Sequence, residues 1–218
     1  MEILFEDEHL IVVNKPSGTP SNTLADSSVD LPSMEEQVAR LYAPSPTYLL
    51  HRLDVGTSGV LLFARNPEAF EGMRNLFRLK QIKKYYWAWS EQKFVGNLPL
   101  EITKEIAHHP KSKKRMIVVE PEKMAHRPQT FYRGKPLPAH TKILSMEPCE
   151  WLGKTLYRYE VEIPTGVMHQ IRVHLKHLGL PLIGDPIYGT EGSRLGLHAH
   201  RIEFKLGNYL YQIEAPAP

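Results

Sequence analysis

The residues best suited to chemistry lie in the stretch His51–Val60, where an arginine and an aspartate, Arg52 and Asp54, stand two positions apart. Apolar runs on both sides of the stretch are typical of buried strands, and Gly56 and Gly59 allow a tight turn between them. Such a turn would hold Asp54 rigidly at the border of a hydrophobic core. A carboxylate there either takes up a proton or finds a cation, because burying it charged and unpaired costs several kcal/mol.

Two arginines could supply that cation. Arg52 is close to Asp54 in sequence, and Arg172 lies on the predicted polar face of a helix late in the chain. In a strand, residues 52 and 54 would point the same way, but the glycine turn weakens that rule. The sequence alone does not choose between the two arginines, and it leaves open whether the pair is a structural clamp or part of a catalytic site.

Local patterns predict the helices that would help to position these residues. Ser33 and Glu36 form a capping box at the start of one helix, and Asn66 followed by Pro67 starts a second. Thr165 caps a third helix, whose end is signalled by a glycine at position 179. The apolar stripe of the third helix comprises Met168, Ile171, Leu175 and Leu178, and the residues on a different face are His169, Arg172 and Lys176.

The strand patterns indicate the fold class. Alternating or apolar runs predict strands at residues 3–5, 10–13, 60–64, 84–89, 116–119, 156–163, 198–206 and 209–213. Their hairpin-like order predicts an α+β fold with a mixed, largely antiparallel sheet. We expect a single domain over residues 1–218, with a basic hairpin insertion around residues 99–139 that ends in a loop near Tyr132–Pro136.

Composition and charge narrow the function classes. The chain has 218 residues, 42% of them hydrophobic, which is enough for a sizeable core. Its formal net charge is +3. Two basic runs could contact phosphates, although each taken alone is more often a solvated surface: Arg74, Arg78, Lys80, Lys83 and Lys84, and then Lys111, Lys113, Lys114 and Arg115. One cysteine, Cys149, excludes an intrachain disulfide, and no apolar run reaches transmembrane length. We therefore expect a soluble, cytoplasmic, monomeric protein with no membrane partner.

Four blocks in series resemble the RluA-type pseudouridine synthases. The two strongest are His-Arg-Leu-Asp-x-x-Thr-Ser-Gly at residues 51–59 and Thr-Gly-x-x-His-Gln-Ile-Arg-x-His-Leu at residues 165–175. Asn-Lys-Pro-Ser-Gly at residues 14–18 and Lys-x-Tyr-x-Ala at residues 84–88 agree in order and spacing. Because the matches begin almost at the first residue, we expect a stand-alone catalytic domain without the family's frequent S4 RNA-binding domain. One position departs from the pattern: Val167 stands where the family has an arginine, which bears on substrate choice or local stability more than on chemistry.

The resemblance implies an RNA pseudouridine synthase, built on a bent sheet flanked by helices, that isomerises a specific uridine in a tRNA or rRNA stem-loop. Asp54 would be the catalytic carboxylate, acting either as a nucleophile at C1′ or as the base that gives a glycal. Arg172 would pair with Asp54, Tyr86 would stack on the uracil, and Arg52 would fill or brace the gap left by the flipped-out base. Further substrate contacts are expected from Thr57, Ser58, Lys84, His169 and Ile171. The reaction needs no cofactor and no metal.

Two other interpretations remain at this point. A catalytically inactive RNA-binding module could keep the same fold, but the presence of both Asp54 and Arg172 argues against it. A metal hydrolase could draw its ligands from His169, His174, His177 and Asp185. That spacing is poor for a metal site, because positions 169 and 174 do not share a helical face.

Overall fold

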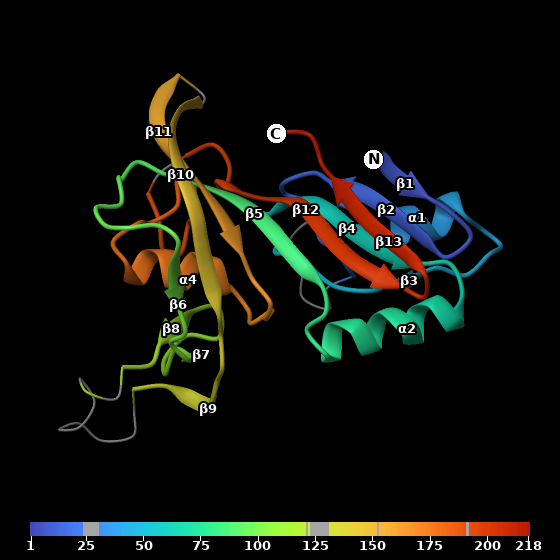
Figure 1. Ribbon diagram of the computed structural model, residues 1–218, viewed down its shortest axis with the longest axis horizontal. Helices are drawn as coiled ribbons and strands as arrows, with labels where there is room; N and C mark the ends of the chain where they lie inside the picture. Colours follow the sequence, from blue (N-terminus) through green and yellow to red (C-terminus); the bar gives the residue numbers. More distant parts are fainter. Residues whose placement is uncertain (24–30, 121, 123–130, 152, 191) are drawn as a thin grey trace. The chain divides into compact units, whose positions relative to one another are not determined.

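The computed structural model describes residues 1–23, 31–120, 122, 131–151, 153–190 and 192–218. The chain forms two compact units, coloured along the sequence in Figure 1. The first unit combines Met1–Tyr86 with Leu197–Pro218, and the second is Trp87–Gly196. The boundary falls inside one strand, β5 (Lys83–Ser90), so that strand contributes its first half to one unit and its second half to the other.

The first unit is a sheet that is mostly antiparallel. Besides the first half of β5, its strands are β1 (Glu2–Glu6), β2 (Leu10–Lys15), β3 (Tyr48–Leu49), β4 (Ser58–Ala64), β12 (Leu197–Leu206) and β13 (Tyr209–Glu214). They lie in the order β1-β2-β4-β12-β5, with β13 on β12 and β3 on β4. The pair β4–β12 is parallel, whereas β1–β2, β2–β4, β3–β4 and β12–β13 are antiparallel. The predicted mixed, largely antiparallel sheet is therefore confirmed.

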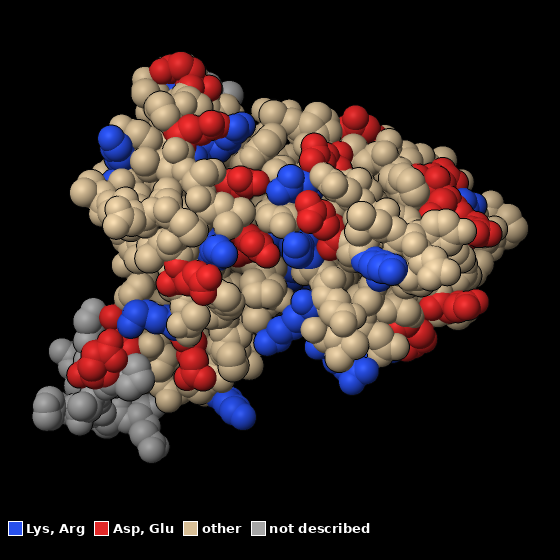
Figure 2. Space-filling view, in the orientation of Figure 1, with Lys and Arg blue, Asp and Glu red and all other residues tan. Residues whose placement is uncertain are grey.

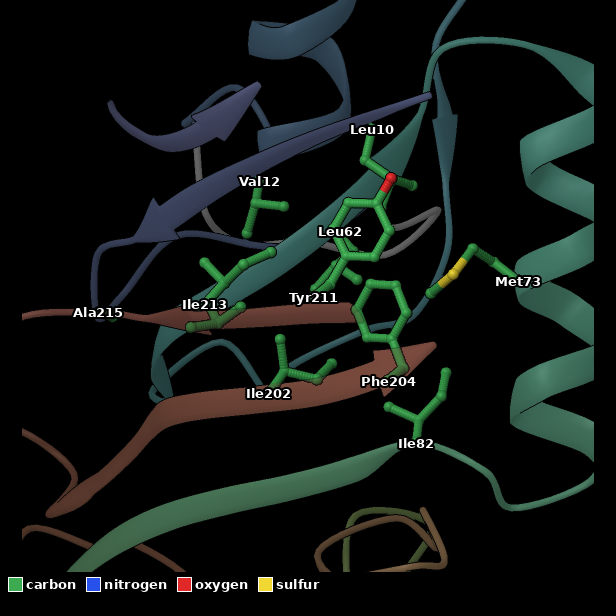
Figure 3. Close-up of a cluster of buried hydrophobic side chains, with 11 residues drawn as sticks. Leu10, Val12, Leu62, Met73, Ile82, Ile202, Phe204, Tyr211, Ile213 and Ala215 are labelled. Atoms are coloured by element: carbon green, nitrogen blue, oxygen red, sulfur yellow. The ribbon is translucent and has the colours of Figure 1, made fainter. Parts of the chain in front are cut away.

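Both helices of the first unit begin as their sequences predict. α1 (Met34–Leu41) has the capping box, with Ser33 accepting from the Glu36 backbone and the Glu36 side chain accepting from Ser33. α2 (Pro67–Arg78) is capped by Asn66 and has its proline in the first turn. Figure 3 shows Met73 of α2 pointing at the apolar side chains of the sheet; the cluster includes Leu10, Leu62, Ile202, Phe204, Tyr211 and Ile213. Burial of this cluster fixes α2 on the sheet.

The second unit is organised around a long hairpin. β10 (Thr141–Trp151) pairs with β11 (Lys154–Glu162), and the strand order is β5-β11-β10-β6, where β6 is Leu100–Ile102. A separate three-stranded sheet has the order β8-β7-β9; its strands are β7 (Ile106–His108), β8 (Met116–Val118) and β9 (Arg133–Leu137). In the described part of the chain, no helix combines the length and hydropathy needed to span a bilayer.

The segment 99–139 differs in one respect from the expected hairpin. The predicted strand at 116–119 is present as β8, but the predicted loop near Tyr132–Pro136 is a strand, β9, which pairs with β7. Gly134 and Pro136 are residues typical of a loop, yet β9 lies at the edge of its sheet, where a proline is tolerated. Residues 121 and 123–130 of the segment lie outside the described residues.

The predicted start of the third helix is wrong. α4 runs from Gln170 to His177 and its N-cap is His169. Its C-cap, Leu178, precedes Gly179, as expected. Thr165 does not cap it, because the Thr165 hydroxyl accepts from the His140 backbone and donates to the Gln170 side chain. The predicted division into faces also fails. Met168 is 39% exposed, whereas every residue from 170 to 175 is buried, including the three polar side chains Gln170, Arg172 and His174.

Candidate active site

Asp54 lies in a tight turn directly before a buried strand. Leu53 is buried, Asp54 is half-buried, and the Thr57 backbone N–H donates to the Asp54 carbonyl at 3.0 Å. Gly59, at the start of β4, has φ +110°, and a Cβ there would lie 2.2 Å from the Ala199 carbonyl oxygen of β12. Only glycine allows β4 and β12 to approach this closely. The turn is therefore anchored to the core through the strand that follows it.

The N-terminal loop, residues 15–21, holds this turn by a set of hydrogen bonds that we call the N-terminal clamp. The Ser21 hydroxyl accepts from the Leu53 N–H at 3.0 Å and lies 2.9 Å from the Leu53 carbonyl, to which it donates. Two more contacts go to the next residues: Gly18 N–H donates to the Val55 carbonyl, and the Ser17 hydroxyl donates to the Gly56 carbonyl. The clamp thus fixes the backbone on both sides of Asp54.

Lys15 completes the clamp with a buried positive charge. Its ammonium group is fully buried and donates to three carbonyl oxygens, those of Pro16, Thr19 and Val55, at 3.1, 2.7 and 3.0 Å. These three bonds use all the donors of a lysine. Burial lowers the pKa of Lys15 to about 7, and the negative charge of Asp54 acts in the opposite direction. Lys15 and Asp54 therefore interact electrostatically.

Tyr86, on β5, also interacts electrostatically with Asp54. It is buried, and burial followed by the Asp54 charge raises its pKa above the usual range. The phenol is consequently neutral, and a neutral phenol has a hydroxyl that can donate a hydrogen bond and a ring that can stack. Lys84 is half-buried on the same strand, with its pKa lowered to about 8 by burial.

Three other predicted residues surround Asp54 in sequence and differ in exposure. Arg52 is exposed, as a contact with a substrate requires. Thr57 and Ser58 are buried, and Ser58 shares a hydrogen bond of 2.8 Å with Nδ1 of His198 on β12. In this structure Ser58 thus joins the parallel strands β4 and β12. A contact of Thr57 or Ser58 with substrate stays a prediction.

Arg172, in the second unit, forms a buried ion pair with Asp185. Its Nε and Nη2 each lie 2.7 Å from one carboxylate oxygen of Asp185, and the two side chains are 5% and 0% exposed. Oδ1 of Asp185 also accepts from the backbone N–H groups of Ile187 and Tyr188. Burial opposes ionisation of Asp185, but its bonds with Arg172 outweigh that effect and lower its pKa. The pairing of Arg172 with Asp54 stays a prediction.

The residues around the start of α4 have specific packing roles. His169 has φ 57°, a conformation that is uncommon for any residue but glycine, and its Nδ1 lies 3.0 Å from the Tyr188 hydroxyl. Ile171 is buried in the first turn of α4. Val167, which replaces the family's arginine, packs against the apolar cluster that contains Tyr188 and Val173. Its side chain therefore stabilises the second unit.

Two of the side chains considered for a metal site, His174 and Asp185, are engaged in other hydrogen bonds. His174 is buried between Thr141 and the Lys104 carbonyl, with distances of 2.8 and 3.0 Å to its two ring nitrogens, and Asp185 pairs with Arg172. Among the described residues, no group of three or more His, Cys, Asp or Glu is arranged to hold a metal ion.

Sequence reasoning missed the roles of three buried polar residues. Lys15 stands in a quoted motif, but nothing in that motif signals that its side chain is buried. Asp185 was considered only as a metal ligand, although Gly184-Asp185-Pro186 has the composition of a fixed turn. Ser21 carries no sequence signal, because its role depends on contact with Leu53, 32 positions away.

Comparisons with known proteins give a consistent result. A family model described as RNA pseudouridylate synthase matches residues 9–177. An uncharacterized RNA pseudouridine synthase of Zymomonas mobilis is 34% identical, over 99% of this chain and 93% of that protein. The dual-specificity RNA pseudouridine synthase RluA of Vibrio parahaemolyticus is 31% identical, over 93% of this chain and 77% of that protein. Ribosomal large subunit pseudouridine synthase D of Nitrosomonas europaea is 33% identical, and the match spans 57% of its length.

A solved structure has the same fold. The human RNA pseudouridylate synthase domain containing 1 superimposes with a TM-score of 0.79 over all of this chain and 83% of that chain, at 23% sequence identity. At that identity the likeness concerns the fold alone. The α+β architecture inferred from the strand patterns is thus found in a known structure.

Proposed function

This chain belongs to the RNA pseudouridylate synthase family and is an isomerase that acts on RNA; from that premise we propose that it converts a specific uridine of rRNA or tRNA to pseudouridine, with Asp54 as the catalytic carboxylate. The observation that carries the proposal is the arrangement around Asp54. A clamp of backbone hydrogen bonds fixes its turn, and its charge acts on both Lys15 and Tyr86. Preorganised groups of this kind are typical of catalytic sites.

The reaction suits a site built from one carboxylate and a neutral phenol. The bond from C1′ to N1 breaks and a bond from C1′ to C5 forms, so C5 loses a proton and N1 gains one, with no net oxidation. Asp54 would act at the sugar, as a nucleophile at C1′ or as a base. Because burial keeps Tyr86 neutral, its ring would stack on the flipped-out uracil.

Arg172 would support the Asp54 charge. Its guanidinium is already held in place by Asp185 through Nε and Nη2, which makes it a buried and preoriented cation. Arg52, which is exposed two positions before Asp54, would fill or brace the gap left by the flipped-out base. Lys84, His169 and Ile171 remain proposed substrate contacts, and we propose that residues 1–218 act as one catalytic domain.

The substrate class rests on the relatives. One is named for the ribosomal large subunit and another for dual specificity, so rRNA is the first substrate to test and tRNA the second. We also propose a stem-loop target, a monomeric enzyme and a cytoplasmic location. The single cysteine suits a reducing compartment.

The test uses purified protein and unmodified cellular RNA. Wild type and Asp54→Asn are incubated with the RNA, and new pseudouridines are mapped as reverse-transcription stops at a chemical adduct. Asparagine keeps the size of the side chain and removes its charge. We expect stops with wild type that are absent with Asp54→Asn, while binding of the same RNA is retained by both proteins.

Either of two results would refute the proposal. An active Asp54→Asn variant would remove the carboxylate from the mechanism. RNA binding by wild type without any new pseudouridine would identify a binding module that lacks the activity.

A further inference from the structure

A cluster of exposed cations lies at the C-terminal end of α2. Arg74, Arg78, Lys80 and Lys83 are all exposed, and we call them the α2 cationic patch. No acidic residue occurs between Gly72 and Ser90. Arg74 pairs with Glu71, three positions before it on α2. In Figure 2, which has the orientation of Figure 1, Lys and Arg side chains gather where α2 leads into β5. Such a surface attracts a polyanion.

The patch adjoins the turn that carries Asp54. Phe77, in the last turn of α2, has its ring 5.6 Å from that of His51, three residues before Asp54. The Lys84 ammonium lies 5.9 Å from the same Phe77 ring. All these contacts are within the first unit. A strand of RNA whose uridine reaches Asp54 therefore has the patch beside it.

Lys80 is the most informative member of the patch. The end of α2 is a Schellman motif: Gln81 N–H donates to the Leu76 carbonyl and Lys80 N–H to the Phe77 carbonyl. The residue at this position must be left-handed, and Lys80 has φ 57°. Glycine is the residue normally found there, because a side chain is strained in that conformation. The chain thus holds an exposed lysine where local stability favours glycine.

From these observations we propose that the α2 cationic patch binds phosphates of the RNA strand beside the target uridine. The inference rests on the proposed function, because it takes RNA as the substrate. It assigns positioning of the strand to the patch and leaves the chemistry to Asp54. Contacts of this kind are independent of base sequence and depend strongly on salt.

The test measures binding of unmodified tRNA over a series of salt concentrations. Lys80→Gly and Arg78→Gln should each reduce the slope of log affinity against log salt by about 0.7, the value for one lost contact with a single strand. Lys80→Gly should also unfold at the same or a higher urea concentration than wild type. Weaker binding without loss of stability is a result that a purely structural lysine does not give.

Arg40→Gln is the matched control. Arg40 and Arg78 are both exposed arginines in the last turn of a helix of the first unit, so the two substitutions change charge and helix dipole alike. We expect the salt slope of Arg40→Gln to equal that of wild type. An unchanged slope in Lys80→Gly and Arg78→Gln, or an equal decrease in Arg40→Gln, would overturn the inference. Binding alone decides it, whereas absence of pseudouridine formation by wild type would refute the proposed function.

Discussion

Ser21→Ala tests whether the N-terminal clamp positions the catalytic turn. The hydroxyl of Ser21 satisfies both the N–H and the carbonyl of Leu53, and both residues are buried. Alanine removes the oxygen without adding volume. A buried polar group left without a partner costs about 1–3 kcal/mol, so two such groups should lower the free energy of unfolding by at least about 2 kcal/mol.

The effect on activity should exceed the effect on binding. Asp54 directly follows Leu53, and a displacement of about 1 Å in a catalytic group can reduce the rate on the order of 100-fold. A domain with a typical stability of about 5–15 kcal/mol stays folded after this loss. We therefore expect a folded variant with a much lower single-turnover rate and nearly unchanged RNA affinity.

Two assays measure these quantities. Urea unfolding gives the free-energy difference, and release of tritium from C5 of labelled uridine follows the reaction, since C5 loses its hydrogen. Ser45→Ala is the control, because Ser45 is exposed after α1 and its substitution should change stability by less than about 0.5 kcal/mol. If Ser21→Ala unfolds and reacts like wild type, the clamp does not position Asp54.

Two further predictions concern buried polar groups of the second unit. Arg172→Met should lower the free energy of unfolding by about 3–5 kcal/mol, because it leaves the buried Asp185 carboxylate without its partner; a neutral result in urea unfolding would contradict this. Burial lowers the pKa of His174 to about 4, below its unfolded value of about 6.5, so the unfolded state takes up the proton first as pH falls. The stability from neutral His174 is therefore present above pH ~6.5 and decreases toward pH ~4 by up to about 3 kcal/mol. Over this pH range the free energy of unfolding of wild type should fall more steeply than that of His174→Gln. Parallel curves of stability against pH for the two proteins would show that His174 does not cause the loss.

Elements specified by neighbouring residues could be predicted from the sequence. The capping box of Ser33 and Glu36 and the start of α2 at Asn66 are local hydrogen-bonding patterns, and both are confirmed. The helix start at Thr165 failed because a distant backbone, that of His140, occupies the Thr165 hydroxyl. Capping rules consider only the next few residues, so they cannot anticipate such a competitor.

The same limit explains what was found and missed in the candidate site. The motif around Asp54 identifies the carboxylate and the turn, because the flanking apolar runs and glycines are contiguous with it. The groups that interact electrostatically with it come from elsewhere in the chain: Lys15 contacts Val55 across 40 positions, and the Asp54 charge raises the pKa of Tyr86 on β5. Burying the Lys15 charge costs free energy that the Asp54 charge only partly offsets, since the pKa of Lys15 still falls to about 7. A lysine buried at that cost, whose charge interacts with Asp54, is better explained by the electrostatics of the candidate site than by the stability of the fold.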